Sequence, residues 1–509
     1  MSKSFVRYFL VVVSLFSFAC QKQTSKTGTP NPTSLQFTQE EIKKASSDLE
    51  SAARTIRGES ADIPLVDLSP DSSRFTSLSS RFSCESAKRA ATASSEVYPI
   101  TLGLVSPAEL QARHRAEHFA VFNAVTGGAV HSPAPRGFVE YIPSELEVAL
   151  ENTPSDVDID FAKLNTHRDA FVVFRGTVGE FNGPDWLTNR DMATGQASRM
   201  HPEAVGQIHH GFLEAYLSAQ TELRSYFTES FVRKSQRLEQ LLRQRLSSKG
   251  LYTQSSIDVY VRAVMDNYQV VITGHSLGGA LATLAAYDFA LQFALNREKL
   301  TLITFAAPAS LYTRAPGAPQ QQSLYQFAHL MDRGTQYGNQ YSAVFFEREG
   351  DIVPRATARE NYYSISPVGR YLYNGNSHQF NGRPENSGLR VGIHAVPGAE
   401  GISAWVQRVA VAIATIGIVN PDFLAAHSMN GYRDDIHAYC DEMSQRQKCL
   451  NYDGLEVAEQ LACDALGMDR ATSNRYFGEL QGVSRVHIMD HPDFRNIRHY
   501  PRPGSSPAP

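Results

Sequence analysis

The 509-residue sequence lacks several features that mark specialised classes of protein. Gly and Pro recur without a fixed period, which excludes collagen-like and solenoid folds. No basic block is interleaved with aromatics, and 48 Lys+Arg against 52 Asp+Glu give a formal net charge of -4. We therefore expect no nucleic acid as a partner. With 42% hydrophobic and 20% charged residues, the chain can instead bury a sizeable core.

The sequence also has little that could cross a membrane. An apolar stretch inside the chain, residues 402–419, contains Gln407 and Arg408, which a spanning helix would have to bury. We interpret this stretch as a packed or interfacial helix. The apolar run at the N-terminus, residues 8–19, is too short to span a bilayer.

The N-terminal run has the form of an export signal. Lys3 and Arg7 precede it, it ends at Ala19-Cys20, and a Ser/Thr/Pro-rich tether follows at residues 21–33. This order resembles a bacterial lipoprotein signal, which implies that Cys20 is acylated and becomes the mature N-terminus. The resemblance predicts an exported protein anchored to a membrane surface of the cell envelope, with the outer membrane favoured. An ordinary cleaved signal peptide is the alternative.

Cysteine is scarce, and its pattern argues against a metal site. Beyond Cys20 there are four residues, Cys84, Cys440, Cys449 and Cys463, with no Cys-x-x-Cys pair or Cys/His cluster at metal-ligand spacing. An even set in an oxidising compartment predicts structural disulfides. Three pairings are possible, and the sequence does not choose among them.

Short apolar runs alternate with helical patterns in the middle of the chain. Four runs have the β-branched and aromatic composition of buried strands: 170–174, 269–273, 302–306 and 343–346. Helical patterns lie at 211–226, 231–246 and 278–293. This alternation predicts an α/β fold with a mostly parallel central sheet covered by helices. The charged side of the second helix faces solvent or, alternatively, a membrane.

The sharpest motif follows the second strand. Gly274, His275, Ser276, Leu277 and Gly278 form Gly-x-Ser-x-Gly between a strand and a helix of small residues. A strand-to-helix turn this tight leaves room only for glycines at its flanks, and it projects the serine hydroxyl from the sheet edge. The motif predicts a nucleophile elbow with Ser276 as the nucleophile, the alternative being a purely structural turn.

A serine hydroxyl needs a base and an acid that orients the base. In this kind of fold the order along the chain is Ser, acid, His. Asp351 is the candidate acid, because it follows the strand at 343–346 and Gly350 permits a sharp turn there. Glu347 and Glu349 are its rivals and are expected to be solvated loop charges.

The histidines after the acid leave the base open on residues alone. There are seven: His378, His394, His427, His437, His487, His491 and His499. A loop that presents the ring ahead of an anchoring helix favours His427 modestly over His394 and His437.

Several motifs together resemble the class 3 lipases, the family of fungal triacylglycerol lipases and related acylhydrolases. They occur in the family's order at Phe174–Thr177, Asp185–Asn189, His210–Tyr216, Thr273–Ala282, Phe305–Pro308, Gly350–Pro354 and His427–Tyr432. The resemblance covers about half the chain and implies an α/β-hydrolase-like fold.

The resemblance also implies roles for individual residues. It favours His427 as the base, and it implies that Thr177 and the backbone N–H of Leu277 form the oxyanion hole. His275 is expected to pack rather than react. The implied activity is hydrolysis of carboxylic esters of lipids, as a lipase or a phospholipase A, without a metal or a cofactor.

The expected organisation has four parts: a signal peptide at 1–20, a tether and extension at 21–95, the hydrolase domain at 96–440, and a Cys-containing extension with a disordered tail at 441–509. Two other functions remain open. One is a catalytically silent surface protein that keeps the fold. The other is an envelope lipoprotein that recruits a partner through 441–509. The same triad would also serve peptide, thioester or polyester cleavage. The oligomeric state is not predicted.

Overall fold

The computed structural model describes residues 37–58, 84–128, 131–154, 157–178, 184–191, 193–293, 295, 299–311, 323–331, 343–348, 351, 353, 370–373, 383–384, 427–449, 452–465 and 470. The predicted export signal with Cys20, the apolar stretch at 402–419, Glu349 and His394 lie outside these residues.

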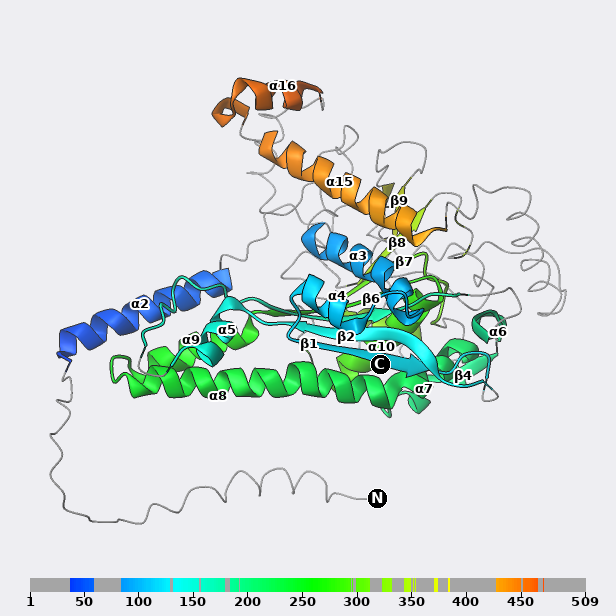
Figure 1. Ribbon diagram of the computed structural model, residues 1–509, viewed down its shortest axis with the longest axis horizontal. Helices are drawn as coiled ribbons and strands as arrows, with labels where there is room; N and C mark the ends of the chain where they lie inside the picture. The colour runs from blue at the N-terminus through cyan, green and yellow to red at the C-terminus, as the bar shows by residue number, and fades with distance from the viewer. Residues whose placement is uncertain are drawn as a thin grey trace, which may run out of the picture.

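An eight-stranded mixed sheet forms the centre of the protein (Figure 1). In spatial order its strands are β1 (His118–Ala124), β2 (Ala134–Ile142), β3 (Arg168–Phe174), β6 (Tyr268–His275), β7 (Leu300–Phe305), β8 (Ala343–Arg348), β9 (Arg370–Tyr373) and β10 (Arg383–Pro384). The pairs from β3 to β9 are parallel, whereas β1, β2 and β10 add antiparallel edges. The four predicted strands are the consecutive parallel strands β3, β6, β7 and β8, which confirms the predicted fold.

The central parallel strands contain apolar runs because both faces of the sheet are covered. In β3, Val172 and Phe174 belong to one core cluster and Phe171 and Val173 to the other, as the two-residue period of a strand requires. All seven residues of β3 are buried. The sheet therefore separates two hydrophobic cores. The ends of its strands remain as the place where polar groups of a functional site can gather.

Helices cover the two faces of the sheet (Figure 1). One core contains α7 (His210–Phe227) and α10 (Leu277–Gln292), and the other contains α3 (Cys84–Thr101) and the first part of α15 (Met429–Cys449). The remaining helices are α4 (Pro107–His114), α5 (Glu145–Asn152), α6 (Pro184–Arg190), α8 (Arg233–Ser248), α9 (Gln254–Asp266), α11 (Ser323–Met331) and α16 (Val457–Ala465). A short hairpin of β4 (Thr194–Gln196) and β5 (Gln207–His209) precedes α7.

The predicted domain boundaries fall inside helices. The boundary after residue 95 cuts α3, whose small residues Ala87 and Ala91 are buried against the sheet. The N-terminal extension also contains α2 (Gln39–Gly58), which packs on α9 through Leu49 and Ala53. Composition does not reveal the packing of α3, because its buried residues are small and form no strong apolar stripe.

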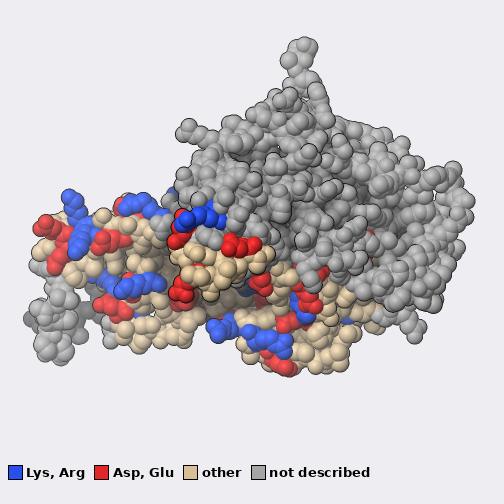
Figure 2. All heavy atoms as spheres, turned by 90° about the horizontal axis from the view of Figure 1, so that it is seen from above, with Lys and Arg blue, Asp and Glu red and all other residues tan. Residues whose placement is uncertain are grey.

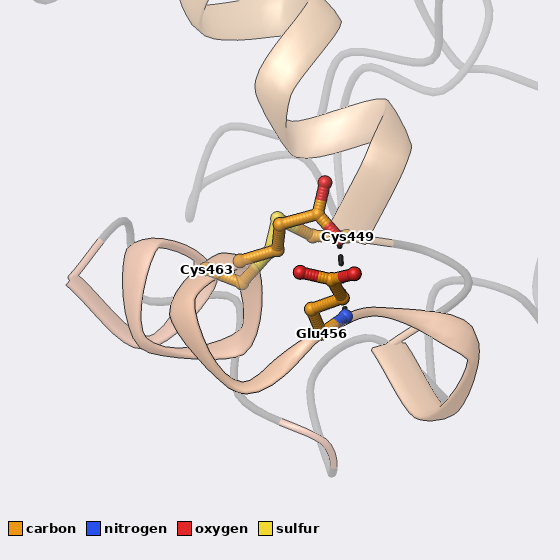
Figure 3. The surroundings of a disulfide bond; sticks show 4 residues. Cys449, Glu456 and Cys463 are labelled. Atoms are coloured by element: carbon orange, nitrogen blue, oxygen red, sulfur yellow. Dashed lines mark hydrogen bonds between the residues drawn. A yellow bond between two sulfur atoms is a disulfide. The ribbon is translucent and has the colours of Figure 1, made fainter.

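The other predicted boundary, after residue 440, cuts α15. This helix is stapled to α16 by a disulfide between Cys449 and Cys463 (Figure 3). Cys440 is disulfide-bonded as well. The cysteines of the C-terminal extension thus form structural disulfides, as the sequence predicts.

The charged side of α8 is compensated by acids. Four of its five basic residues pair with carboxylates: Arg233 with Glu229, Lys234 with Glu117, Arg237 with Glu151, and Arg243 with Glu239 and Asp258. Paired charges favour a solvated helix over a membrane-facing basic surface. On the face seen in Figure 2, basic and acidic residues are likewise intermixed over the described atoms. No helix in the described part of the chain is long and apolar enough to cross a membrane.

Candidate active site

Ser276 lies at the turn between β6 and α10, as the elbow motif predicts. Its φ of 56° and ψ of -130° are unusual for a residue with a Cβ. The flanking glycines are required by close packing. A Cβ on Gly274 would lie 2.4 Å from the carbonyl oxygen of Gly278, and one on Gly278 would lie 2.4 Å from that of Phe174. The strain at Ser276 is thus imposed by a turn that admits no larger flanking residue.

His427 lies just before α15 and contacts both Ser276 and Asp351. Its Nε2 is 3.0 Å from Ser276 Oγ, and its Nδ1 is 2.9 Å from Asp351 Oδ2. A carboxylate can only accept a hydrogen bond, so Nδ1 carries the proton and Nε2 is free to accept the serine proton. This is the arrangement of a nucleophile, a base and an orienting acid.

Asp351 is held as a buried carboxylate. Its Oδ2 accepts a hydrogen bond from the Tyr432 hydroxyl at 2.8 Å, and its Oδ1 accepts one from the Val353 backbone N–H at 3.0 Å. Burial acts to raise the pKa of Asp351, but His427 and these donors outweigh burial and hold the pKa below its usual value. The motif at 427–432 contains Tyr432, yet its spacing alone does not reveal that this hydroxyl reaches the acid.

Of the rival residues, the structure describes the position of His437 and the strand that contains Glu347. His437 is one and a half turns further along α15 than Tyr432, and its Nε2 is 3.1 Å from Thr92 Oγ1 rather than from the serine. Glu347 belongs to β8. Among the described residues, Asp351 and His427 are therefore the pair that the fold brings to Ser276.

Thr177 follows β3 and lies beside Ser276. A Cβ on the preceding Gly176 would lie 3.1 Å from Ser276 Cβ, so the two turns are in direct contact. The amide of Asn189 donates to Thr177 Oγ1 at 3.2 Å. Because this oxygen is used as an acceptor, the hydroxyl proton of Thr177 remains available for donation. Asn189 lies in the predicted Trp-containing segment, but that motif does not show its partner.

Leu277 supplies the second predicted donor. It is the first residue of α10 and is fully buried. The first backbone N–H groups of a helix have no partner within the helix, and the helix dipole favours negative charge at this end. Both predicted donors, on Thr177 and Leu277, thus flank Ser276 at the same end of the sheet.

A buried ionic cluster supports the loop that carries Thr177. Asp185 Oδ1 accepts from Arg136 Nη2 at 2.5 Å, and Oδ2 accepts from the Val178 backbone N–H at 2.9 Å. Arg175 Nη2 lies 3.6 Å from Oδ2. Burial and the neighbouring Arg136 lower the pKa of Arg175 to about 10, so Arg175 is still a cation at neutral pH. Two cations and one anion are buried here, which leaves a net positive charge close to the oxyanion loop.

Sequence reasoning missed this cluster. Arg136 is on β2, outside every motif, and Asp185 is in a motif whose contacts the spacing does not show. The signal available was a charged residue, Arg136, within a mostly apolar segment. In the described part of the chain, no group of three or more His, Cys, Asp and Glu residues could hold a metal ion.

Known proteins match the part of the chain that holds the elbow. Residues 171–361 match the family described as Lipase (class 3). A phospholipase A1 from Oryza sativa subsp. indica, "EG1, chloroplastic/mitochondrial", is 34% identical over 145 residues, which are 28% of this chain and 29% of the relative. Phospholipase A1-Ialpha2 of Arabidopsis thaliana is 31% identical over 158 residues, covering 29% and 28% of the two chains. The chain thus spans less than a third of each relative.

Among solved structures, the native Rhizomucor miehei lipase propeptide complex is 19% identical. The similarity covers 57% of this chain and 67% of the lipase chain, with a TM-score of 0.31.

Proposed function

We propose that this chain, with its class 3 lipase segment at residues 171–361, is a serine hydrolase that cleaves carboxylic ester bonds of lipids. The observation that carries the proposal is the continuous chain of contacts from Ser276 Oγ through His427 to Asp351. A strained serine at an elbow, with a base and a buried acid in line, has no evident use in a protein that only binds.

In the first half of the reaction, Ser276 Oγ attacks the ester carbonyl carbon while His427 Nε2 takes its proton. The carbonyl electrons move to oxygen, where the N–H groups of Thr177 and Leu277 and the Thr177 hydroxyl stabilise the negative charge. When the carbonyl re-forms, the bond to the leaving alkoxide breaks, and His427 gives the proton to that oxygen. Asp351 stabilises the imidazolium in between.

In the second half, water takes the place of the alcohol. His427 removes a proton from the water as it attacks the acyl-enzyme, and the proton returns to Ser276 Oγ when the fatty acid leaves. Every step uses side chains, backbone N–H groups and water, so the proposal needs no metal or cofactor.

Membrane phospholipids are the proposed first substrates, with cleavage of a phospholipase A type. Two considerations support this choice over triacylglycerol. The relatives named above are phospholipases A1. The proposed acylation of Cys20 would also hold the enzyme at a membrane surface, in contact with phospholipid. A triacylglycerol lipase of Arabidopsis thaliana is 29% identical over 161 residues, so acylglycerols belong in the same test.

The test is fatty-acid release from vesicles that contain phospholipid, diacylglycerol and triacylglycerol, with protein that begins after Cys20. The Ser276→Ala variant is the control, because it removes the nucleophile and leaves the fold intact. We expect release by the wild type and none by the variant, with phospholipid consumed first. Equal release by both proteins, or silence of the folded wild type, would overturn the proposal. Labelling of intact cells for acylated Cys20, with Cys20→Ser as control, tests the anchor separately.

A further inference from the structure

His275 precedes the nucleophile, and both of its ring nitrogens have partners. Nδ1 lies 2.8 Å from the Tyr98 hydroxyl of α3, and Nε2 lies 2.8 Å from the backbone carbonyl oxygen of His427. His275 is 5% exposed, and its ring centroid is 4.7 Å from that of His427. A histidine that only filled space would not need a partner at each nitrogen.

The partners fix the protonation of His275. A carbonyl oxygen can only accept a hydrogen bond, so Nε2 carries the proton and donates a hydrogen bond to the backbone carbonyl oxygen of His427. A neutral imidazole has one N–H, which leaves Nδ1 bare to accept the Tyr98 proton. Burial, together with the neighbouring His427, lowers the pKa of His275 to about 3, so the ring stays neutral at any working pH. The hydrogen bonds therefore run in one direction, from Tyr98 through His275 to His427.

The Tyr98 hydroxyl also reaches the oxyanion loop. A Cβ on Gly176 would lie 2.3 Å from the phenol oxygen, so the backbone of Gly176 lies directly against the phenol. Gly176 immediately precedes Thr177. One hydroxyl from α3 thus contacts the loop that carries Thr177 and, through a single imidazole, the backbone of His427.

We propose that Tyr98 and His275 are positioning residues that set the distance between the oxyanion loop and His427. Thr177 of this loop follows β3 and His427 lies just before α15, and the two residues are 250 positions apart in sequence. Without the Tyr98–His275 connection, the ring of His427 keeps its acid but loses the support that aims Nε2 at Ser276. This inference rests on the proposed function.

The experiment compares Tyr98→Phe, His275→Leu and His275→Gln with the wild type. Phe removes only the hydroxyl. His275→Leu preserves apolar packing, and the side-chain amide of His275→Gln can still donate an N–H to the His427 carbonyl oxygen. Tyr260→Phe is the control, because the buried Tyr260 likewise uses its hydroxyl in a hydrogen bond, donating to the Phe161 carbonyl oxygen at 2.7 Å, in a separate core. The readouts are thermal unfolding, the rate of Ser276 labelling by a fluorophosphonate, and kcat and KM on a soluble short-chain ester.

We expect Tyr98→Phe and His275→Leu to lower both the labelling rate and kcat about tenfold to a hundredfold with KM little changed, because small misplacements of catalytic groups cost this much. His275→Gln should recover part of the loss. Tyr260→Phe should lower the unfolding temperature by a similar amount to Tyr98→Phe and leave kcat unchanged.

The outcomes separate this inference from the function on which it rests. If the wild type is labelled at Ser276 but Tyr98→Phe and His275→Leu label and turn over within about twofold of it, only the positioning role is overturned. The positioning role is also overturned if Tyr260→Phe loses as much kcat as Tyr98→Phe, or if His275→Leu is as active as His275→Gln. If the folded wild type is not labelled at all, the proposed function fails and this inference fails with it. Should Tyr98→Phe not fold, the kcat of His275→Leu compared with that of His275→Gln decides whether His275 has a positioning role.

Discussion

Two regions of the molecule contribute to the site in different ways. Residues 171–361, which match the lipase family, contain the proposed nucleophile, the proposed acid and the proposed oxyanion loop, each following a strand. The proposed base, His427, lies outside this match, as do Tyr432 on α15 and Tyr98 on α3. The first region builds reactive groups from tight turns, whereas the second aligns them by packing helices that are distant in sequence. Function should therefore be lost steeply in the first region and at His427, and more gradually among the supports.

Removing His427 should have the largest effect of the substitutions considered, although this residue lies outside the family match. We expect His427→Ala to lower kcat about a millionfold, as the loss of a base does in serine hydrolases. His437→Ala is the control, because His437 lies on α15, close to His427 in sequence, and contacts Thr92 instead of Ser276. Steady-state kinetics on a soluble ester would measure both, and equal losses would refute the assignment of the base.

Replacing the acid within the matched region should cost less. Asp351→Asn keeps the shape of the side chain but changes its charge and its hydrogen bond to His427 Nδ1. We expect kcat to fall about 10⁴-fold, because the imidazole then adopts the wrong tautomer. Asp434→Asn, an exposed acid on α15, should leave kcat unchanged. Retention of a tenth or more of kcat by Asp351→Asn would contradict the role of the acid.

The ionic cluster joins the two regions, since Asp185 lies inside the match and Arg136 outside it. Asp185→Asn should lower kcat about a hundredfold, because the oxyanion loop loses the anion that holds it. It should also destabilise the fold by about 3 kcal/mol, because two buried cations remain. Asp288→Asn is matched for burial and stability: Asp288 is fully buried between Tyr216 and Arg224. It should unfold at a similar denaturant concentration with kcat intact, and a comparable loss of kcat would argue that both changes act through stability alone.

The smallest effect is expected at His114, outside the matched residues, and concerns how the stability of the fold depends on pH. Burial acts to lower the pKa of His114, but hydrogen bonds with Glu140 and Glu96 outweigh it and raise the pKa to about 9. A raised pKa stabilises the fold fully below about pH 6.5, and this stabilisation is lost as the pH rises through 9. His114→Gln should therefore cost about 1 kcal/mol at pH 6 and little at pH 10. Denaturant unfolding at both values measures this, with His437→Gln as the control; a loss independent of pH would contradict the pairing.

The strands and the elbow within residues 171–361 were largely predictable from the sequence. The strands of the parallel sheet are apolar runs because both faces are buried, and the glycines at 274 and 278 mark a turn that admits no side chain there. Local composition carries this information. Asp351 could be predicted for the same reason, since it follows such a strand directly.

The roles of Tyr98, His275 and His427 were less predictable, because they depend on long-range packing. Nothing in the sequence around Tyr98 shows that its hydroxyl meets His275, 177 residues away. His275 was expected to pack, and the structure adds a hydrogen-bonding partner at each nitrogen. The choice of His427 from seven histidines depended on family resemblance, because the loop before α15 has no distinctive composition. The antiparallel strands β1 and β2 were not predicted, since polar and charged residues interrupt them.

The backbone of Ser276 places reactivity and conformational stability in opposition. Its positive φ costs about 1–3 kcal/mol for a residue with a Cβ. An alanine at this position abolishes the hydroxyl but keeps the strain, whereas a glycine removes both. Ser276→Gly should therefore unfold at a higher denaturant concentration than Ser276→Ala, by a margin reduced through the greater freedom of glycine in the unfolded chain. An inactive protein more stable than the active one would identify the elbow as a place where the molecule gives up stability for chemistry.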